Sequence, residues 1–391
     1  MNFDKAYFDA GICRIGTECE KWDGMIASTG DADMIPMWVA DMDFPSPPAV
    51  KEALARVLER GTWGYTMSGK PDKEALSAYC ARRHGTKIDP AHVVLSPCVV
   101  TGLKLALRAV TKEGDGILIN PPVYGPFFMS IKANGRKVVE SPLVADENNR
   151  YSMNLAEMEE KLASGEAKAV MICSPHNPVG RAWSEAELTA LVGICRKYGA
   201  KIICDEIHAD FVYAPGTHVS ILNIPGAREM AVMLCAASKT FNVAGLEQSA
   251  IVCEDDEIRA AIERDMNAAG VKAGNCFALA ATRAAYADCD AWIDGLKAYL
   301  AGSRDMVAAY VAENMPKIKV SPLEATYLMW LDCRALGLAQ EELLARIGEA
   351  HVKVNDGLFF GEAGRGFILL NIGCPRSQIE AALKQLKTVL G

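Results

Sequence analysis

The sequence predicts an α/β protein, in which a mostly parallel sheet between helices is followed by a smaller α+β module. From about residue 90 onward, short runs rich in Val, Ile and Cys alternate with stretches of helical periodicity. Alternating strands and helices are typical of parallel sheets, and unbroken apolar runs are typical of strands covered on both faces. The chain has 391 residues, 50% of them hydrophobic, which suits two or three domains that each bury a core.

The N-terminal 45 residues differ from the rest of the chain. They contain Trp22, Trp38 and several aspartates but no long periodic run, so we expect an extended arm. The arm ends at the proline-rich segment 44–48. Because proline fits the first turn of a helix, we expect a helix over 50–60 directly after it.

The period of the apolar residues assigns the elements of the two later regions. In the α/β region we expect strands at 92–95, 116–120, 137–140, 169–173, 201–204, 231–234 and 250–253, and helices at 101–110, 185–198 and 257–268. The chain is predicted to be helical from about 275 to 314. Beyond that point we expect strands at 320, 327–331, 352–354 and 367–370, and helices at 341–350 and 378–390.

Composition argues against several classes of protein. Lys plus Arg is 41 and Asp plus Glu is 49, so the net charge of −8, with no basic block, does not favour nucleic-acid binding. The 13 cysteines are scattered and never spaced Cys-x-x-Cys, so we expect free thiols in a reducing cytoplasm and no metal site. The N-terminus does not resemble a secretory signal, and no apolar run reaches the roughly 18 residues that span a bilayer. We therefore expect a cytoplasmic protein that does not bind membranes.

Three polar motifs directly follow three of the predicted strands. They are Ser-Pro-His-Asn-Pro at 174–178, Asp-Glu-Ile-His at 205–208 and Ala-Ser-Lys-Thr at 237–240. Ligands bind at the carboxyl ends of strands in α/β sheets, so Asn177, Asp205 and Lys239 are predicted to converge on one site. Taken singly, each residue also fits an ordinary turn, a helix cap or a solvated side chain. The hypothesis of a common site rests on the occurrence of all three together.

Further motifs run from one end of the chain to the other. They are Lys-Trp-Asp at 21–23, Ile-Pro-Met-Trp-Val-Ala-Asp-Met-Asp-Phe at 35–44, Gly-Tyr-Thr at 64–66, Pro-Val-Tyr-Gly-Pro-Phe at 122–127, Ser-Lys-Thr-Phe-Asn-Val-Ala-Gly-Leu at 238–246, Thr-Tyr-Leu-Met-Trp-Leu-Asp at 326–332 and Cys-Pro-Arg-Ser at 374–377. With these motifs the chain resembles, over essentially its whole length, pyridoxal-phosphate enzymes of the aspartate aminotransferase fold (fold type I). Within them it resembles the MalY/PatB branch of carbon–sulfur lyases.

This resemblance implies a large domain with a mostly parallel seven-stranded sheet between helices, and a smaller α+β domain. We expect an arm at 1–45, the large domain at 46–285 and the small domain at 286–391. The implied cofactor is pyridoxal 5′-phosphate, and the implied assembly is a homodimer with shared active sites. The implied reaction is α,β-elimination of an L-cysteine S-conjugate such as cystathionine, which gives pyruvate, ammonia and a thiol.

The resemblance also implies the roles of individual residues around the cofactor ring. Lys239 would link covalently to the cofactor aldehyde and, once freed, take the Cα proton. Asp205 would keep the pyridine nitrogen protonated, so that the ring can accept electrons. Asn177 would donate to the ring hydroxyl oxygen and contact the substrate, and Tyr124 would stack on the ring. His208 would either bond the same oxygen or support the site from behind.

The phosphate group is expected at a predicted helix start. Backbone N–H groups of Val99, Val100 and Thr101 would face it, helped by the helix dipole and by the hydroxyl of Ser238. Tyr65 resembles a tyrosine that reaches the phosphate from the neighbouring subunit, which would make the site depend on a dimer.

Three departures from the family pattern concern this cofactor site. Cys98 stands where the family usually has glycine, and Ala236 stands where it often has serine or alanine, so the phosphate cup has fewer hydroxyls. Aminotransferase relatives carry an arginine eight residues after the lysine, and here that position is Glu247. The missing arginine favours a lyase over an aminotransferase.

A fourth departure concerns the substrate, which the resemblance places against Ala40 and Asp41. The family motif Gly-Phe-Ile-Arg-Leu-Asn reads Gly-Phe-Ile-Leu-Leu-Asn here, so Leu369 replaces the arginine that clamps the substrate α-carboxylate. Leucine cannot supply the bidentate pair that arginine forms. Either Arg365 or Arg376 reaches the carboxylate instead, or the substrate has no α-carboxylate at that position.

Two other functions stay open at this point. An aminotransferase would use the same cofactor, although Glu247 and the Ala-Asp-Met-Asp sequence of the arm argue against it. A protein whose main role is to bind a partner, such as a transcription regulator, is the third possibility, and the acidic composition gives it no specific support.

Overall fold

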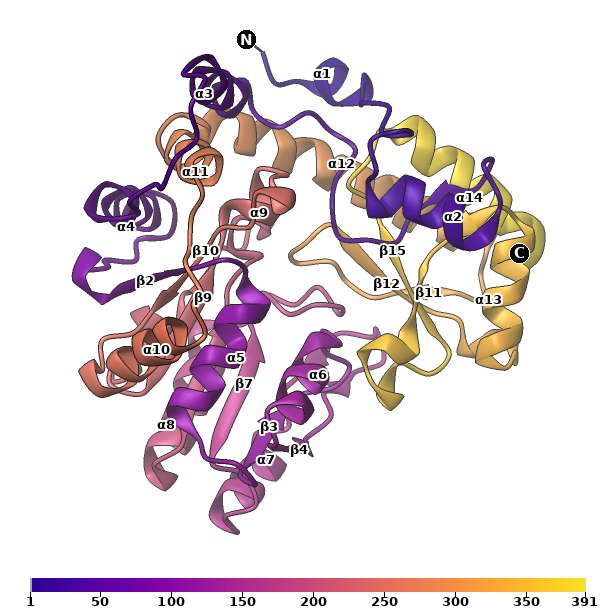
Figure 1. Ribbon diagram of the computed structural model, residues 1–391. Helices are drawn as coiled ribbons and strands as arrows, with labels where there is room; N and C mark the ends of the chain where they lie inside the picture. Colours follow the sequence, from indigo (N-terminus) through magenta and orange to yellow (C-terminus); the bar gives the residue numbers. More distant parts are fainter. Residues whose placement is uncertain (1) are drawn as a thin grey trace.

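The computed structural model describes residues 2–391, so only residue 1 of the predicted arm lies outside it. A seven-stranded sheet dominates the fold (Figure 1), with its strands in the order β2-β10-β9-β8-β7-β3-β4. The strands are β2 Val93–Ser96, β3 Gly116–Ile119, β4 Lys137–Glu140, β7 Ala169–Cys173, β8 Lys201–Asp205, β9 Ala231–Cys235 and β10 Ser249–Val252. Only β10 runs antiparallel to its neighbours, which confirms the predicted α/β class with a mostly parallel sheet.

Helices cover both faces of this sheet, and β7 shows why its strands read as unbroken apolar runs. Ala169, Met171 and Cys173 point into a core shared with α5 (Val99–Val110), α6 (Pro126–Ala133) and α10 (Asp256–Ala268). The alternate residues Val170 and Ile172 point into a second core, with α7 (Leu155–Ala163) and α8 (Glu185–Tyr198). Because successive side chains of a strand point to opposite faces, a strand covered on both sides needs apolar residues at every position.

A second sheet of four strands lies beside the first, in the order β11-β12-β15-β14. Its strands are β11 Lys319–Val320, β12 Leu328–Asp332, β14 Asn355–Asp356 and β15 Phe367–Asn371. The accompanying helices are α12 (Asp290–Asn314), α13 (Gln340–Glu349) and α14 (Arg376–Leu390). The strand expected at 352–354 is β13 (Val352–Lys353), which pairs with β1 (Ile35–Pro36) of the arm instead of joining this sheet.

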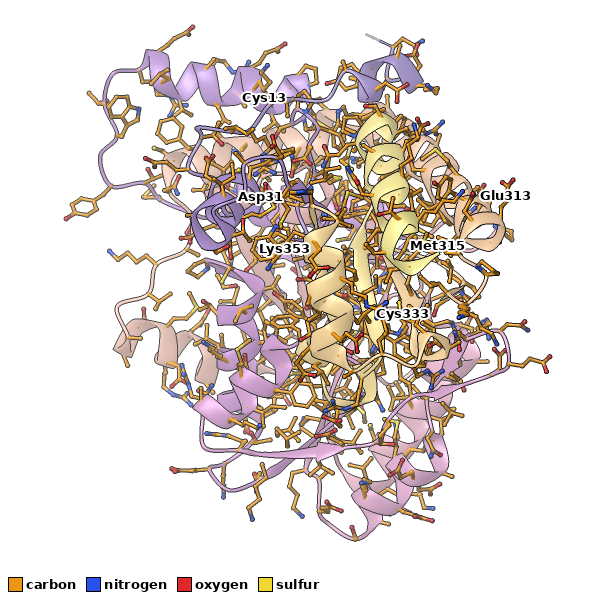
Figure 2. All side chains as sticks on the ribbon, turned by 90° about the vertical axis from the view of Figure 1, so that its right-hand side faces the viewer. Cys13, Asp31, Glu313, Met315, Cys333 and Lys353 are labelled. Atoms are coloured by element: carbon orange, nitrogen blue, oxygen red, sulfur yellow. The ribbon has the colours of Figure 1, made fainter. Side chains whose placement is uncertain are left out.

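The arm is not simply extended, because it contains three short helical segments. These are α1 (Lys5–Asp9), a π-helical turn at Glu20–Gly24 and α2 (Met25–Thr29). Each is only five residues long, too short for an apolar period to be visible in the sequence. Figure 2 shows Asp31 of the arm close to Lys353 of β13, in agreement with the parallel pairing of β1 and β13.

The buried carboxylate of Asp43 fixes the arm to the body of the protein. It accepts hydrogen bonds from Lys21 Nζ at 2.8 Å and Trp22 Nε1 at 3.0 Å, and Arg14 Nη1 lies at 3.3 Å. Asn242 donates to the carbonyls of Met42 and Phe44. Through these contacts, the polar residues of the arm motifs set the path of the arm across the molecule.

Three helices pack together at one edge of the seven-stranded sheet (Figure 1): α3 (Pro48–Glu59), α4 (Lys70–His84) and α11 (Cys276–Asp288). The segment 60–69 that joins α3 to α4 carries exposed Trp63, Tyr65 and Met67. The predicted boundary between 285 and 286 falls in the last turn of α11, and the domain limits stay a prediction. Within residues 2–391, no helix is long and apolar enough to cross a membrane, and no group of His, Cys, Asp and Glu could hold a metal ion.

Candidate active site

A cavity of about 580 Å³ lies where β7, β8 and β9 end, and the arm and the four-stranded sheet complete its wall. Most of the predicted site residues line it. They are Ala40, Asp41, Val99, Val100, Tyr124, Asn177, Asp205, His208, Ser238, Lys239 and Leu369. The convergence of three strand-end motifs is the geometry that parallel strands impose, since their carboxyl ends meet at one edge of the sheet.

Asp205, the last residue of β8, puts a carboxylate in the wall of this cavity. It is only 2% exposed, and its Oδ1 accepts one hydrogen bond, from the Ile207 N–H at 3.0 Å. Burial raises the pKa of Asp205 to about 7, and the nearby charge of Lys239 opposes the shift. A carboxylate so poorly solvated is strongly stabilised by a cationic partner, such as a protonated ring nitrogen.

Lys239 lies on the single turn α9 (Ala237–Thr240) that follows β9. Its Nζ donates to the carbonyl oxygen of Ala40 in the arm, at 2.6 Å. Burial lowers the pKa of Lys239, although the charges of Asp41, Asp205 and Glu20 oppose that shift. A lowered pKa increases the fraction of neutral amine, which is the form that acts as a nucleophile or a base.

Besides Asp41 Oδ1 and Gln248 Oε1, two buried polar groups in the cavity have no partner among residues 2–391. They are Asn177 Oδ1 and His208 Nδ1. Burial, with the charge of Lys239, lowers the pKa of His208 to about 3, so its imidazole is neutral. Buried polar atoms are rarely left unpaired, so both groups are open to hydrogen bonds with a bound molecule. Beside them, the Tyr124 N–H donates to the carbonyl of Asn177 at 3.1 Å, and burial raises the pKa of the Tyr124 hydroxyl.

The N-terminus of α5 opens into the same cavity. The cap residue Cys98 forms no side-chain cap hydrogen bond, and the helix ladder starts with Gly102 N–H donating to the Cys98 carbonyl. The amides of Val99, Val100 and Thr101 precede that first bond and have no acceptor within the helix. Val99 and Val100 line the cavity, whereas Thr101 does not, and its hydroxyl lies 3.3 Å from Cys98 Sγ.

The other half of the cavity is formed by the arm and the four-stranded sheet. Leu369, on β15, is 1% exposed and stands in register with Trp330 and Asn355 on the neighbouring strands. The arm is held against this wall because Asn371 Nδ2 donates to the carbonyls of Val39 and Asp41, at 2.5 and 2.8 Å.

Three predicted residues lie away from the cavity. Tyr65 is fully exposed on the segment 60–69, so within one chain it does not reach the site. Arg376 packs over the ring of Tyr299 and donates to that residue's carbonyl at 2.9 Å, so it joins α14 to α12 instead of facing a substrate. Arg365 pairs with Glu362 on the surface.

Several lining residues were not identified from the sequence. They are Glu20, Trp38, Val39, Pro97, Cys173, Ile207, Ala244, Gln248, Leu328, Asn355, Phe359 and Phe360. Trp38 and Val39 lie within a motif that was recognised, so their position in the arm was the available signal. Phe359 and Phe360 lie on a short 3-10 turn, Gly357–Phe360, and no periodic pattern marks such a turn.

This donor set fits pyridoxal 5′-phosphate. A buried carboxylate suits the ring nitrogen, an unpartnered amide and a neutral imidazole suit the ring hydroxyl oxygen, and Lys239 suits the aldehyde. The free amides at the start of α5 suit a phosphate group.

Comparison with known proteins agrees with a site for this cofactor. The family described as aminotransferase class I and II matches residues 32–386. Over the full length of both chains, the protein is 36% identical to cystathionine β-lyase PatB of Bacillus subtilis, and it is 32% identical to protein MalY of Escherichia coli over 97% of each chain. The structure of cystalysin from Treponema denticola, which contains a pyridoxal 5′-phosphate cofactor, superposes with a TM-score of 0.94 at 31% identity, covering 97% of each chain.

Proposed function

The chain belongs to the aminotransferase class I and II family, and from this premise we propose that it is a pyridoxal-phosphate-dependent carbon–sulfur lyase. The reaction is α,β-elimination from a β-thioether amine of the cysteine S-conjugate type, which for cystathionine gives pyruvate, ammonia and a thiol. One observation carries the proposal: Asn177, Asp205 and Lys239 converge in one cavity. Full-length similarity to cystathionine β-lyase PatB supports the lyase over the aminotransferase.

When bound, the cofactor supplies an electron sink that stabilises negative charge on Cα. Asp205 would hold the ring nitrogen by direct charge pairing, and this pairing would relieve the cost of burying its carboxylate. Lys239, whose pKa burial lowers, takes the proton from Cα. Asn177 and His208, which line the cavity with unpartnered polar atoms, would orient the ring through its hydroxyl oxygen, and Tyr124 would pack on the ring face. The bond between Cβ and sulfur then breaks, and the thiolate leaves with the bonding electrons.

The proposal extends to a cytoplasmic homodimer whose subunits share their active sites. Trp63, Tyr65 and Met67 form an exposed apolar group on one loop, and clustered apolar surface of this kind is typical of interaction sites. A partner that covered this loop would bring Tyr65 toward the phosphate end of a neighbouring cavity. The ligand we propose is a small sulfur-containing amine or amino acid, and we expect no role for nucleic acid or membrane.

The direct test is to mix the purified, cofactor-loaded protein with a panel of thioether amines and amino acids, cystathionine included, without any keto acid. A lyase releases thiol over many turnovers, together with pyruvate when the substrate is an amino acid. An aminotransferase stops after one equivalent of cofactor has reacted. A single turnover that resumes only after a keto acid is added would contradict the lyase proposal. The Lys239→Ala variant, loaded with the same cofactor, is the control for uncatalysed elimination.

A further inference from the structure

The charges that line the active-site cavity are strongly unbalanced. Among residues 2–391, the charged side chains of its wall are four carboxylates and a single ammonium group, and no guanidinium reaches it. The carboxylates are Glu20, Asp41, Asp205 and Glu247, and the ammonium is Lys239. In the proposed function Lys239 reacts with the cofactor and Asp205 pairs with the ring nitrogen. Within the described part of the chain, no fixed cation is then left in the wall for a substrate anion.

The remaining acids keep the substrate side negative. Arg14 pairs with Asp41 at 2.7 Å, which offsets that charge. Glu20 and Glu247 are exposed at the rim and form no ion pair within the described chain. Glu20 and Asp41 both line the cavity, and their charges act on Lys239, with which the substrate would react. A cavity lined by one sign of charge attracts ligands of the opposite sign and repels ligands of the same sign.

The wall on the side of the four-stranded sheet contains an apolar group of residues. Leu369 and Phe360 are each 1% exposed and Leu328 is 0% exposed, and all three line the cavity. A carboxylate placed against this wall would lose hydration and gain no charge-assisted hydrogen bond, which is the unfavourable way to bury an anion. An alkyl group or a hydrogen atom in the same place has no charge to desolvate, and an alkyl group also adds apolar contact.

The nearby cations of the chain form ion pairs or stacking contacts with other residues. Arg14 bonds Asp41 and Asp43, and Lys21 is buried against Asp43 at 2.8 Å. Arg376 packs on Tyr299, behind the four-stranded sheet. None of these cations can turn to a substrate without breaking a contact that holds the arm or the helices in place.

We propose that the natural substrate is a primary amine with a β-thioether and no α-carboxylate, of the form R–S–CH₂–CH₂–NH₃⁺. This inference rests on the proposed lyase function and specifies its substrate class. In the reaction the Cα proton is removed, the Cβ–S bond breaks, and the thiol R–SH leaves. The enamine product tautomerises to an imine, and one water hydrolyses it to acetaldehyde and ammonia, so that atoms and electrons balance without an oxidant or reductant.

Binding of ligands that cannot undergo elimination tests the substrate class without requiring turnover. Propylamine and L-2-aminobutyrate differ only by the carboxylate, and neither has a leaving group. By calorimetry on the cofactor-loaded protein, we expect propylamine to bind at least about tenfold more tightly, which corresponds to about 1.4 kcal/mol. Equal or tighter binding of L-2-aminobutyrate would overturn the inference.

Turnover separates this inference from the proposed function. We expect the kcat/KM for thiol release from 2-(methylthio)ethylamine to exceed that for S-methyl-L-cysteine by at least about tenfold, and the Leu369→Arg variant to reverse the order. Leu369→Met is the matched control, because it keeps an apolar wall and should keep the wild-type preference. If S-methyl-L-cysteine is the better wild-type substrate, the lyase stands and the inference falls. If neither compound releases thiol, the lyase proposal fails, and the binding comparison still decides whether the cavity rejects carboxylates.

Two variants test separately whether the charge at the rim contributes to the preference. Glu20→Gln should reduce the ratio of the affinities for propylamine and L-2-aminobutyrate about threefold, because it removes one carboxylate that lines the cavity. Glu18→Gln removes an exposed carboxylate from the same segment, outside the cavity wall, and should leave the preference unchanged. Equal effects of the two variants would refute a role for the rim charge.

Discussion

The two halves of the active-site cavity differ in how they are built. The cofactor half lies at the ends of parallel strands, and its polar groups Asn177, Asp205 and Lys239 each match one part of pyridoxal 5′-phosphate. The proposed substrate half is formed by the arm and β15, and it presents Leu369; among the lining residues within 2–391, no cation is left there for a substrate. The proposed cofactor chemistry therefore rests on one half, and the proposed substrate preference rests on the other. Reaction type and substrate choice are carried by separate surfaces of the same fold.

The largest expected effect is on the cofactor half, through Lys239. Lys239→Ala should reduce thiol release roughly 10⁴-fold or more, because it removes both the covalent anchor and the base. Lys197→Ala, at an exposed lysine paired with Glu159, should be near wild type. Borohydride reduction followed by peptide mapping should place the pyridoxyl label on Lys239, and a label on another lysine would contradict the assignment.

Asp205→Ala tests whether the electron sink depends on one carboxylate. We expect the variant to bind cofactor weakly and to exchange the substrate Cα proton on the order of 10³-fold more slowly, since nothing then favours the protonated ring. Exchange in D₂O followed by NMR gives the rate. Near-normal exchange would show that another group protonates the ring.

The raised pKa of Asp205 makes a separate prediction for the protein without cofactor. Its folded pKa of about 7 lies above the ordinary value of 3.8, so stability present at low pH is lost as the pH rises toward and through 7. Asp205→Asn removes this dependence. The free energy of unfolding of Asp205→Asn, relative to wild type, should increase by about 2 to 3 kcal/mol between pH 5 and pH 8. Urea unfolding at each pH measures both proteins. If their free energies of unfolding change equally with pH, the pKa of Asp205 is not raised by burial.

Sharing of sites between subunits predicts recovery of activity in mixed dimers. A Tyr65→Phe chain and a Lys239→Ala chain are each impaired, but one site of the hybrid has an intact Lys239 and an intact Tyr65. Random exchange should restore about a quarter of wild-type activity, because half the dimers are hybrids with one working site each. No recovery after verified subunit exchange, or an active monomer by light scattering, would contradict the shared site.

The smallest effect is expected at Arg376, on the far side of the substrate half. Arg376→Gln should lower the free energy of unfolding by about 1 kcal/mol, because it removes the contacts with Tyr299. It should leave the preference between 2-(methylthio)ethylamine and S-methyl-L-cysteine unchanged. Arg365→Gln, at an exposed ion pair, is the control and should change neither quantity measurably. A changed preference with unchanged stability would instead place Arg376 in substrate recognition.

The cofactor half could be predicted from the sequence because its signals are local. Every strand of the large sheet was found within two residues at each end, since a strand buried on both faces must be apolar throughout. The candidate site residues lie at the ends of those strands or shortly after them, so locating β7, β8 and β9 also located Asn177, Asp205 and Lys239. The arm was predicted less well, because its five-residue helices show no period and its path depends on partners such as Asn242 and Asn371.

The sequence by itself determined the α/β class and the strand positions, and it predicted the groups of the candidate site, including the replacement of an expected arginine by Leu369. Only the tertiary structure decided what that replacement means. It shows that Arg365 and Arg376 are bound elsewhere, and that Glu20 and Glu247 join Leu369 around one cavity. These residues are far apart along the chain and follow no common period. Their meeting is set by how the arm packs between the two sheets, and local sequence patterns do not encode that packing.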